Sequence, residues 1–211
     1  MQIQKVAEAD FPTRFGHFRI YGFQGTLPVN GAPSASQALQ PEEEEIVALV
    51  MGDMTDANAP PPLVRIHSRC LTGDVFHSLR CDCRAQLEIA LEMVAAEGRG
   101  VIVYENQEGR GIGLLNKLRA YELQDHGADT VEANEQLGFA ADLRDYALPG
   151  AVLRYFGLRA VRLLSNNPEK IEALERAGVN VTERVPCIAP DPTQARQYLA
   201  TKKYKMGHLL D

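Results

Sequence analysis

The order in which hydrophobic patterns follow one another constrains the fold of this chain more than any other feature. Residues 18–23 and 45–51 cluster or alternate apolar side chains as antiparallel strands do. From Cys83 onward, apolar residues at helical spacing alternate with short apolar runs. Strands that come first alone and then alternate with helices predict an α+β fold, a mixed sheet with N-terminal antiparallel strands and helices packed on it.

Local signals place the later elements. The predicted strands cover residues 63–67, 100–104, 161–165 and 180–185. The predicted helices cover residues 83–97, 114–126, 129–139, 168–177 and 194–205. Asp129 and Glu132 have the spacing of a capping box, and Asn167 followed by Pro168 predicts the start of a helix.

The size and composition of the chain favour a single packed domain. Of its 211 residues, 45% are apolar and 24% are charged, as in ordinary soluble domains. A chain of this length buries enough surface in one core, so we expect one domain over residues 1–211. Residues 27–45 are rich in proline, serine, alanine and glycine and end in four glutamates, which predicts an inserted surface loop.

Charge and hydropathy exclude several classes of protein. The 22 basic and 28 acidic residues give a formal net charge of −6, which argues against a nucleic-acid-binding protein. Residues 1–12 lack the apolar stretch of a secretory signal, and no apolar run approaches the roughly 18 residues that span a bilayer. We therefore expect a cytoplasmic protein that binds neither nucleic acid nor membrane.

Three of the four cysteines, Cys70, Cys81 and Cys83, lie close together in the sequence. Two cysteines separated by one residue do not easily close an unstrained disulfide, but as thiolates they bind one soft divalent cation, by default zinc. Three protein ligands predict a catalytic zinc with one open position. Two alternatives stay open, namely a structural site completed by the distant Cys187 and a group of buried inert thiols.

Polar groups are dense in the segments next to these cysteines. Residues 65–69 lead directly into Cys70, and residues 107–111 form a glycine-containing turn between a predicted strand and a predicted helix. Such a turn lets backbone amides and an arginine approach a phosphate, while its glutamate offers an acceptor to the edge of a base. Residues 165–170 form a second possible anion site, because a helix N-terminus and Lys170 both favour negative charge.

Taken together, six ordered motifs resemble the GTP cyclohydrolase II family, and the resemblance covers nearly the whole chain. The motifs are residues 70–74, 78–83, 107–114, 130–134, 137–139 and 142–146. The resemblance implies an enzyme that opens the imidazole ring of GTP and releases formate and pyrophosphate. It also implies one Zn²⁺ per chain, Mg²⁺ with the triphosphate, and a homodimer.

The same resemblance assigns roles to individual residues. It implies that Cys70, Cys81 and Cys83 bind zinc. It makes Asp142 the proton acceptor, Arg144 the nucleophile toward the α-phosphorus, and Tyr121 a catalytic tyrosine. It places GTP contacts at Arg65, Ile66, His67, Ser68, Arg69, Gln86, Glu108, Gly109, Arg110, Thr130, Ser165 and Lys170.

The role of Arg144 leaves two alternatives. A guanidinium stays protonated in proteins, so it attacks phosphorus only after a base removes a proton. Asp142 lies two residues away, and helical side chains at that spacing do not face each other. Either this segment is not a regular helix, or Arg144 holds the α-phosphate electrostatically while water attacks.

Three residues depart from the pattern of the family beside the expected site. Arg69 replaces a common glutamate, Arg84 a glycine, and Asn106 an arginine. These changes leave two further functions open: a related hydrolase that acts on another purine, pyrimidine or pterin, and a zinc-containing nucleotide-binding protein without catalysis.

Overall fold

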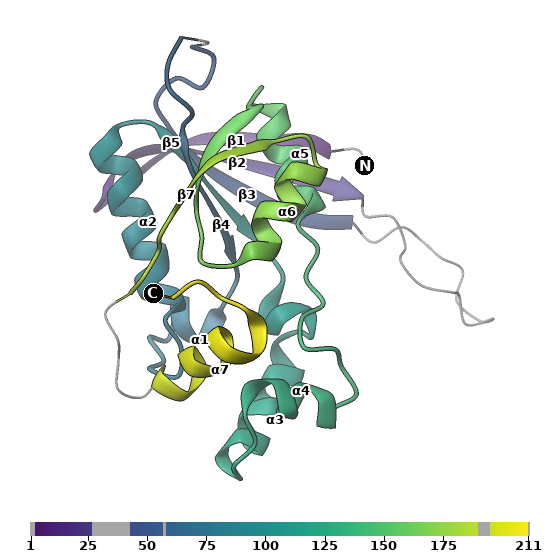
Figure 1. Ribbon diagram of the computed structural model, residues 1–211. Helices are drawn as coiled ribbons and strands as arrows, with labels where there is room; N and C mark the ends of the chain where they lie inside the picture. Colours follow the sequence, from purple (N-terminus) through teal and green to yellow (C-terminus); the bar gives the residue numbers. More distant parts are fainter. Residues whose placement is uncertain (1–2, 27–42, 57, 190–194, 211) are drawn as a thin grey trace, which may run out of the picture.

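One mixed sheet organises the part of the chain described by the computed structural model, residues 3–26, 43–56, 58–189 and 195–210 (Figure 1). Its strands are β1 (Ile3–Thr13), β2 (Gly16–Thr26), β3 (Glu43–Met51), β4 (Leu63–Ser68), β5 (Gly100–Glu105), β6 (Ala160–Leu164) and β7 (Asn180–Val185). They follow the order β1-β2-β3-β5-β4-β6-β7. Neighbours from β1 to β5 pair antiparallel, and neighbours from β5 through β4 to β7 pair parallel. The predicted α+β fold is confirmed.

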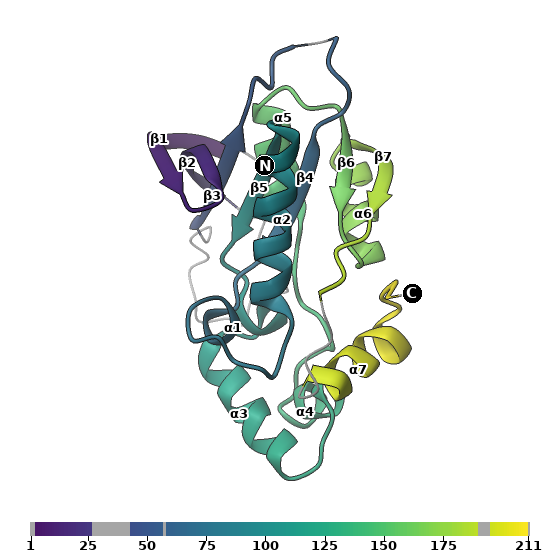
Figure 2. The same ribbon diagram turned by 90° about the vertical axis from the view of Figure 1, so that its left-hand side faces the viewer.

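Helices cover both faces of the sheet (Figure 2). α2 (Cys83–Glu97) packs on one face, and α5 (Ala147–Tyr155) and α6 (Pro168–Arg176) pack on the other. Successive residues of the central strands alternate between these faces, as Leu63 joins the cluster under α2 and Val64 joins the cluster under α5 and α6. Strands buried on both sides favour continuous apolar runs, as in β5, whereas β4 contains Arg65 and His67 and was predicted from the prolines that precede it.

Smaller elements gather beyond the carboxyl ends of the parallel strands. They are α1 (Leu71–Asp74), the 3₁₀ turn η1 (Glu108–Gly111), α3 (Leu114–Asp125), α4 (Thr130–Gln136) and α7 (Arg196–Met206). Both views show α1, α3, α4 and α7 below the sheet (Figures 1 and 2). In sheets with parallel strands this edge is where ligands bind.

The predicted helix starts have the expected caps. Asp129 accepts hydrogen bonds from the backbone of Val131 and Glu132, and Glu132 completes the capping box. The Asn167 side chain accepts a hydrogen bond from the Glu169 backbone at the start of α6. Short-range capping chemistry therefore placed these two helices correctly.

Two of the longer elements, β1 and α5, were absent from the sequence-based prediction, as were the short α1 and η1. The side chains of β1 are exposed along almost its whole length, so the strand shows no apolar alternation. α5 contains Pro149 and Gly150, which signal a break, yet its residues are largely buried. Gly150 is needed for packing, because a Cβ at this position would lie 2.5 Å from the Cβ of Ala177.

The predicted surface loop over residues 27–45 falls mostly outside the described residues. Its last three residues, 43–45, were wrongly assigned to the loop, because they pair with β2 as the beginning of β3. Within the described ranges, no helix is long and apolar enough to cross a membrane.

Candidate active site

The candidate site lies where three parallel strands end. Cys70 follows β4, Gln107 follows β5 and Ser165 follows β6, so their loops share one edge of the sheet. Two adjoining cavities lie there, and their linings share Ser68 and Arg144. We name them the thiol compartment, which contains the clustered cysteines, and the cationic compartment, whose lining has five arginine and lysine side chains and no carboxylate among the described residues.

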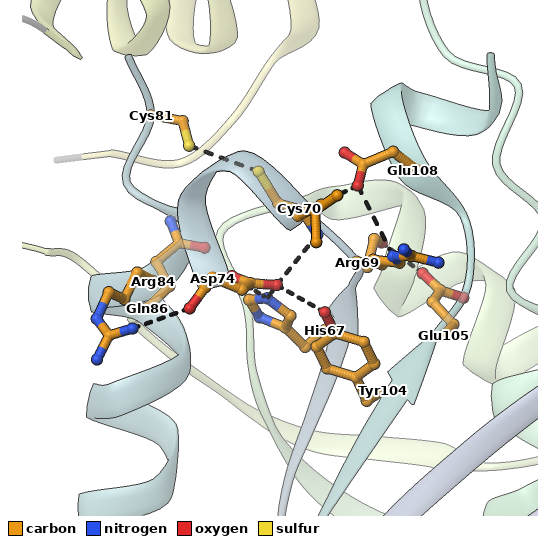
Figure 3. A network of polar contacts seen from close by, with 12 residues as sticks. His67, Arg69, Cys70, Asp74, Cys81, Arg84, Gln86, Tyr104, Glu105 and Glu108 are labelled. Atoms are coloured by element: carbon orange, nitrogen blue, oxygen red, sulfur yellow. Dashed lines mark hydrogen bonds and ion pairs between the residues drawn. The ribbon is translucent and has the colours of Figure 1, made fainter. Parts of the chain in front are cut away.

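The thiol compartment is built around Cys70, Cys81 and Cys83. Their sulfur atoms lie within 4.8 Å of one another, and the sulfurs of Cys70 and Cys81 are 3.7 Å apart (Figure 3). Gly73 leaves room for this approach, because a Cβ there would lie 2.9 Å from the Cys81 sulfur and 3.1 Å from the Cys70 sulfur. Three soft donors around a space that a methyl group would fill fit a zinc ion.

Cys187 lies outside this group. Its fully buried thiol donates to the carbonyl of Gln86 at 3.5 Å, and none of the four cysteines forms a disulfide. The structure therefore disfavours a structural zinc site made of all four cysteines. Three ligands leave one position of a tetrahedral ion for another molecule.

The clustered thiols change one another's acidity. Hydrogen bonds from Cys81 and Cys83 lower the pKa of Cys70, and the Lys117 ammonium, 3.1 Å from the Cys70 sulfur, lowers it further. The hydrogen bond that Cys81 donates to Cys70 raises the pKa of Cys81 to about 11. Negative charge is thereby concentrated on the Cys70 sulfur, which favours the binding of a cation.

A buried carboxylate holds the turn that carries Cys70 (Figure 3). Asp74 accepts hydrogen bonds from the Cys70 backbone at 3.0 Å and from the Tyr104 hydroxyl at 2.9 Å. The Nε2 atom of His67 lies 3.1 Å from the same carboxylate, and its ring stacks on Tyr104. Burial lowers the pKa of His67, so the ring is neutral and serves to hold this turn. Asp74 lies in the motif 70–74 without an assigned role, and Tyr104 was not among the expected site residues.

Glu108 and Lys117 connect the loop after β5 to the cysteine turn. Glu108 accepts hydrogen bonds from the Leu71 backbone at 2.7 Å and from the Lys117 ammonium at 2.6 Å. Lys117 also donates to the Cys70 sulfur. The sequence offered the glutamate as an acceptor for a base, whereas in the structure both of its oxygens are engaged in orienting the cysteine turn. Lys117 was not among the expected site residues.

The loop after β5 has a left-handed backbone that positions Arg110. Gly109 and Arg110 have φ values of 64° and 62°, a region that residues other than glycine rarely adopt. Arg110 is only 9% exposed and lines both compartments. Its two terminal nitrogens contact no acceptor in the described part of the chain. An anionic ligand would remove the cost of burying this guanidinium without a partner.

Tyr121 and Thr130 line the thiol compartment from α3 and α4. The Tyr121 hydroxyl lies 3.2 Å from the hydroxyl of Thr72, and its ring lies 4.8 Å from the Arg80 guanidinium. Burial raises the pKa of Tyr121, so the phenol keeps its proton at neutral pH. The phenol is thus available as a proton donor.

Asp142 and Arg144 lie in an irregular segment before α5. The Nε atom of Arg144 is 2.9 Å and 3.2 Å from the two oxygens of Asp142, and Nη1 donates to Ser68 at 3.2 Å. The segment is not helical, which is why side chains two residues apart meet. Burial opposes ionisation of both groups, but their contact lowers the pKa of Asp142 and, with Tyr146, raises that of Arg144.

The cationic compartment has a lining without carboxylates among the described residues. Its basic side chains are Arg65, Arg110, Arg144, Lys170 and Lys202. Lys170 donates to the carbonyl of Ile66 at 2.8 Å, and burial together with the charges of Arg65 and Arg144 lowers its pKa. Arg144 and Lys202 pair with the carboxylates of Asp142 and Asp82, whereas Arg65 and Arg110 form no ion pair in the described ranges, so the lining favours an anionic ligand.

The remaining predicted contacts fall around this second compartment. Gln86 accepts a hydrogen bond from Arg65 at 2.6 Å, and Ser165 lines the wall at the end of β6. The side chain of Ile66 is fully buried in the core, so only its backbone faces the site. The fold therefore brings the expected binding residues to one edge, with Ile66 as a backbone position and Asp142 behind Arg144.

Two of the three departures from the family pattern contact each other. Nη1 of Arg69 donates to the Asn106 side chain at 2.8 Å, and its Nε lies 3.9 Å from Glu108. Arg84 donates to the carbonyl of Asp74 at 2.8 Å and pairs with Glu88 (Figure 3). These arginines are engaged with protein groups around the cysteine turn.

Substitution of Gly73 by alanine is expected to weaken zinc binding. The added methyl group would overlap two of the ligand sulfurs, so we expect the zinc Kd to rise by at least about tenfold. Competition with a chromogenic chelator measures this change. Gly22→Ala is the control, because a Cβ at Gly22 meets nothing within 4 Å. An unchanged zinc affinity in Gly73→Ala would show that the cysteine turn adjusts freely.

Comparison with known proteins gives consistent relatives. The model of the family described as GTP cyclohydrolase II matches residues 4–186. A protein named GTP cyclohydrolase-2 from Yersinia pseudotuberculosis is 52% identical over 210 residues, covering 100% of this chain and 99% of the relative. One of the same name from Shigella boydii is 51% identical over 211 residues and covers 100% of both chains.

Proposed function

The chain belongs to the GTP cyclohydrolase II family, and on that premise we propose that its site opens the imidazole ring of GTP and releases formate and pyrophosphate. The observation that carries this function is the meeting of three clustered thiols with an unpartnered, buried arginine at one cavity. The thiol compartment takes the base, and the cationic compartment takes the phosphate chain. Water adds to C8 of guanine, a second water releases that carbon as formate, and a further water cleaves the bond between the α- and β-phosphates.

One zinc ion per chain is held by Cys70, Cys81 and Cys83 in this proposal. A bound zinc ion supplies Lewis-acid chemistry that activates water near neutral pH. Glu108 and Asp74 keep the cysteine turn in place through the backbone N–H groups of Leu71 and Cys70. Such supporting hydrogen bonds orient metal ligands and strengthen binding.

Tyr121 donates a proton to the nitrogen that leaves C8. Its phenol is buried next to the thiols and remains protonated, because burial raises its pKa. The nearby Arg80 and Lys117 cations stabilise the phenolate that forms in this step. General-acid catalysis of this kind typically contributes about 10²–10⁴ in rate.

Arg144 holds the α-phosphate while water attacks it. Its ion pair with Asp142 keeps the guanidinium protonated, which suits an electrostatic role better than a nucleophilic one. Asp142 orients Arg144 through this ion pair, and its role as proton acceptor stays a prediction of the family resemblance. Mg²⁺ accompanies the triphosphate and neutralises part of its charge.

A product analysis tests the proposed function. Protein loaded with zinc is incubated with GTP and Mg²⁺, and the products are identified by mass. We expect formate, pyrophosphate and a diaminopyrimidine that retains the ribose 5-phosphate. The same incubation with ATP is the control, and we expect no product from it. A fully metallated protein that leaves GTP intact but opens another purine or a pterin would contradict the proposal.

A further inference from the structure

The C-terminal segment, residues 198–208, reaches the candidate site although it lies beyond residues 4–186 matched by the family model. After α7, Gly207 adopts a left-handed backbone with φ of 65°. The N–H of His208 then donates to the carbonyl of Lys202 at 3.0 Å. The N–H of Leu209 donates to the carbonyl of Asn166 at 2.9 Å. The tail is thereby fixed beside the loop that follows β6.

A buried ion pair fixes α7 relative to the cysteine cluster. The Lys202 ammonium lies 2.9 Å from the Asp82 carboxylate, and these side chains are 10% and 3% exposed. Asp82 lies between Cys81 and Cys83 in the sequence. Separating a buried pair leaves an uncompensated charge, so the pair specifies where α7 docks.

His208 has an unused ring nitrogen inside the cationic compartment. Its Nε2 atom is buried and contacts no hydrogen-bond partner in the described ranges. Burial, together with the charges of Lys202, Arg144, Lys170 and Arg110, lowers the pKa of His208 to about 3. The ring is therefore neutral near pH 7 and offers a hydrogen bond without adding a charge.

Five residues that line this cavity carry a buried polar atom without a hydrogen-bond partner in the described ranges, namely Arg65, His67, Arg110, Asn167 and His208. Arg110, nine-tenths buried, comes from the loop after β5, and His208 comes from the C-terminal tail. Leaving such groups unsatisfied costs free energy. A ligand with several negatively charged oxygens would accept hydrogen bonds from donors such as Arg110 and His208 and offset the charge of the surrounding cations.

We propose that the C-terminal tail completes the binding site for the phosphate chain, with the Nε2 atom of His208 donating a hydrogen bond to a phosphate oxygen. This inference rests on the proposed function, which supplies the nucleotide. Lys202 is a positioning residue here, because its ion pair with Asp82 determines where the tail lies. The C-terminal segment therefore contacts both the phosphate-binding compartment, through His208, and the cysteine cluster, through the ion pair of Lys202 with Asp82.

Calorimetric titration with inorganic pyrophosphate tests this inference on the zinc-loaded protein. For His208→Ala we expect the Kd for pyrophosphate to rise about tenfold, the usual effect of losing a hydrogen bond to a charged group. The Kd for guanosine, which lacks phosphate, is expected to stay unchanged. His208→Gln, which keeps a donor at a similar position, is expected to recover most of the affinity. Tyr204→Ala, at an 80% exposed position of α7, is the control.

The outcomes separate this inference from the proposed function. If wild-type protein turns over GTP while His208→Ala binds pyrophosphate as wild type does, the inference is wrong and the proposed function stands. Equal weakening of pyrophosphate and guanosine binding also contradicts it, because that pattern indicates a structural role. If wild-type protein releases no formate from GTP, the proposed function itself fails.

Discussion

Replacement of Cys81 by serine is expected to remove both zinc and catalysis. A serine hydroxyl is a poor zinc ligand, so two thiolates remain for the ion. We expect bound zinc, measured by atomic emission after gel filtration, to fall from about one per chain to near zero. Formate release from GTP should fall by a factor on the order of 10³ or more, because the Lewis acid is lost.

Cys187→Ser is the matched control for this change. It is the same substitution at a buried cysteine whose sulfur contacts the Gln86 carbonyl and not the cluster. We expect it to retain its zinc and most of its activity. Loss of zinc from Cys187→Ser would support the alternative hypothesis of a structural zinc site that includes Cys187. Retention of zinc in Cys81→Ser would remove the basis of the catalytic proposal.

Arg144→Ala is expected to give the second large effect, on the cleavage of the triphosphate. The variant removes a fixed cation from the α-phosphate, and losing one such donor typically lowers kcat by about 10²–10³. It also leaves the Asp142 carboxylate, whose side chain is 9% exposed, without its ion-pair partner. Breaking a buried pair costs about 3 kcal/mol, so thermal unfolding should shift downward as well. Pyrophosphate release and thermal melting measure the two effects separately.

Two comparisons sharpen this test. Arg176→Ala breaks an exposed arginine–glutamate pair on α6, and we expect it to change stability by less than about 1 kcal/mol and activity hardly at all. Arg144→Lys keeps the charge but loses the planar fork, so intermediate activity is expected. Rapid chemical quenching followed by mass analysis distinguishes an Arg144 that holds the phosphate electrostatically from one that attacks it as a nucleophile. A nucleotide attached to Arg144 through a nitrogen–phosphorus bond would refute the electrostatic role.

Much of the fold followed from local patterns. A continuous apolar run predicted β5, the prolines before Leu63 predicted the start of β4, and side-chain caps predicted the starts of α4 and α6. β1 was not predicted, because an edge strand with exposed side chains carries no apolar alternation. α5 was not predicted, because Pro149 and Gly150 have low helix propensity. The burial of this segment in the tertiary structure outweighs that propensity.

The candidate site shows the same division. The cysteine spacing and the ordered motifs predicted the zinc ligands and the binding residues. Asp74 lies in the first ordered motif, but its hydrogen bond to the Cys70 backbone was not predicted. Lys117 and His208 were not predicted as site residues, because each reaches the site through contacts with segments distant in the sequence. The contact of Asp142 with Arg144 also depended on a backbone that is not helical.

The sequence alone determined which chemistry the chain carries, because ligand type, ligand number and motif order are properties of residues and their spacing. The tertiary structure decided which cysteines lie together, which polar side chains form hydrogen bonds within the protein, and which buried polar groups have no partner. Cys187 is excluded from the cluster, Glu108 is engaged in supporting the cysteine turn, and Arg110 and His208 are buried without partners. Burial and long-range contact set these differences, because the cost of an unpaired polar group depends on its surroundings and not on its neighbours in the chain.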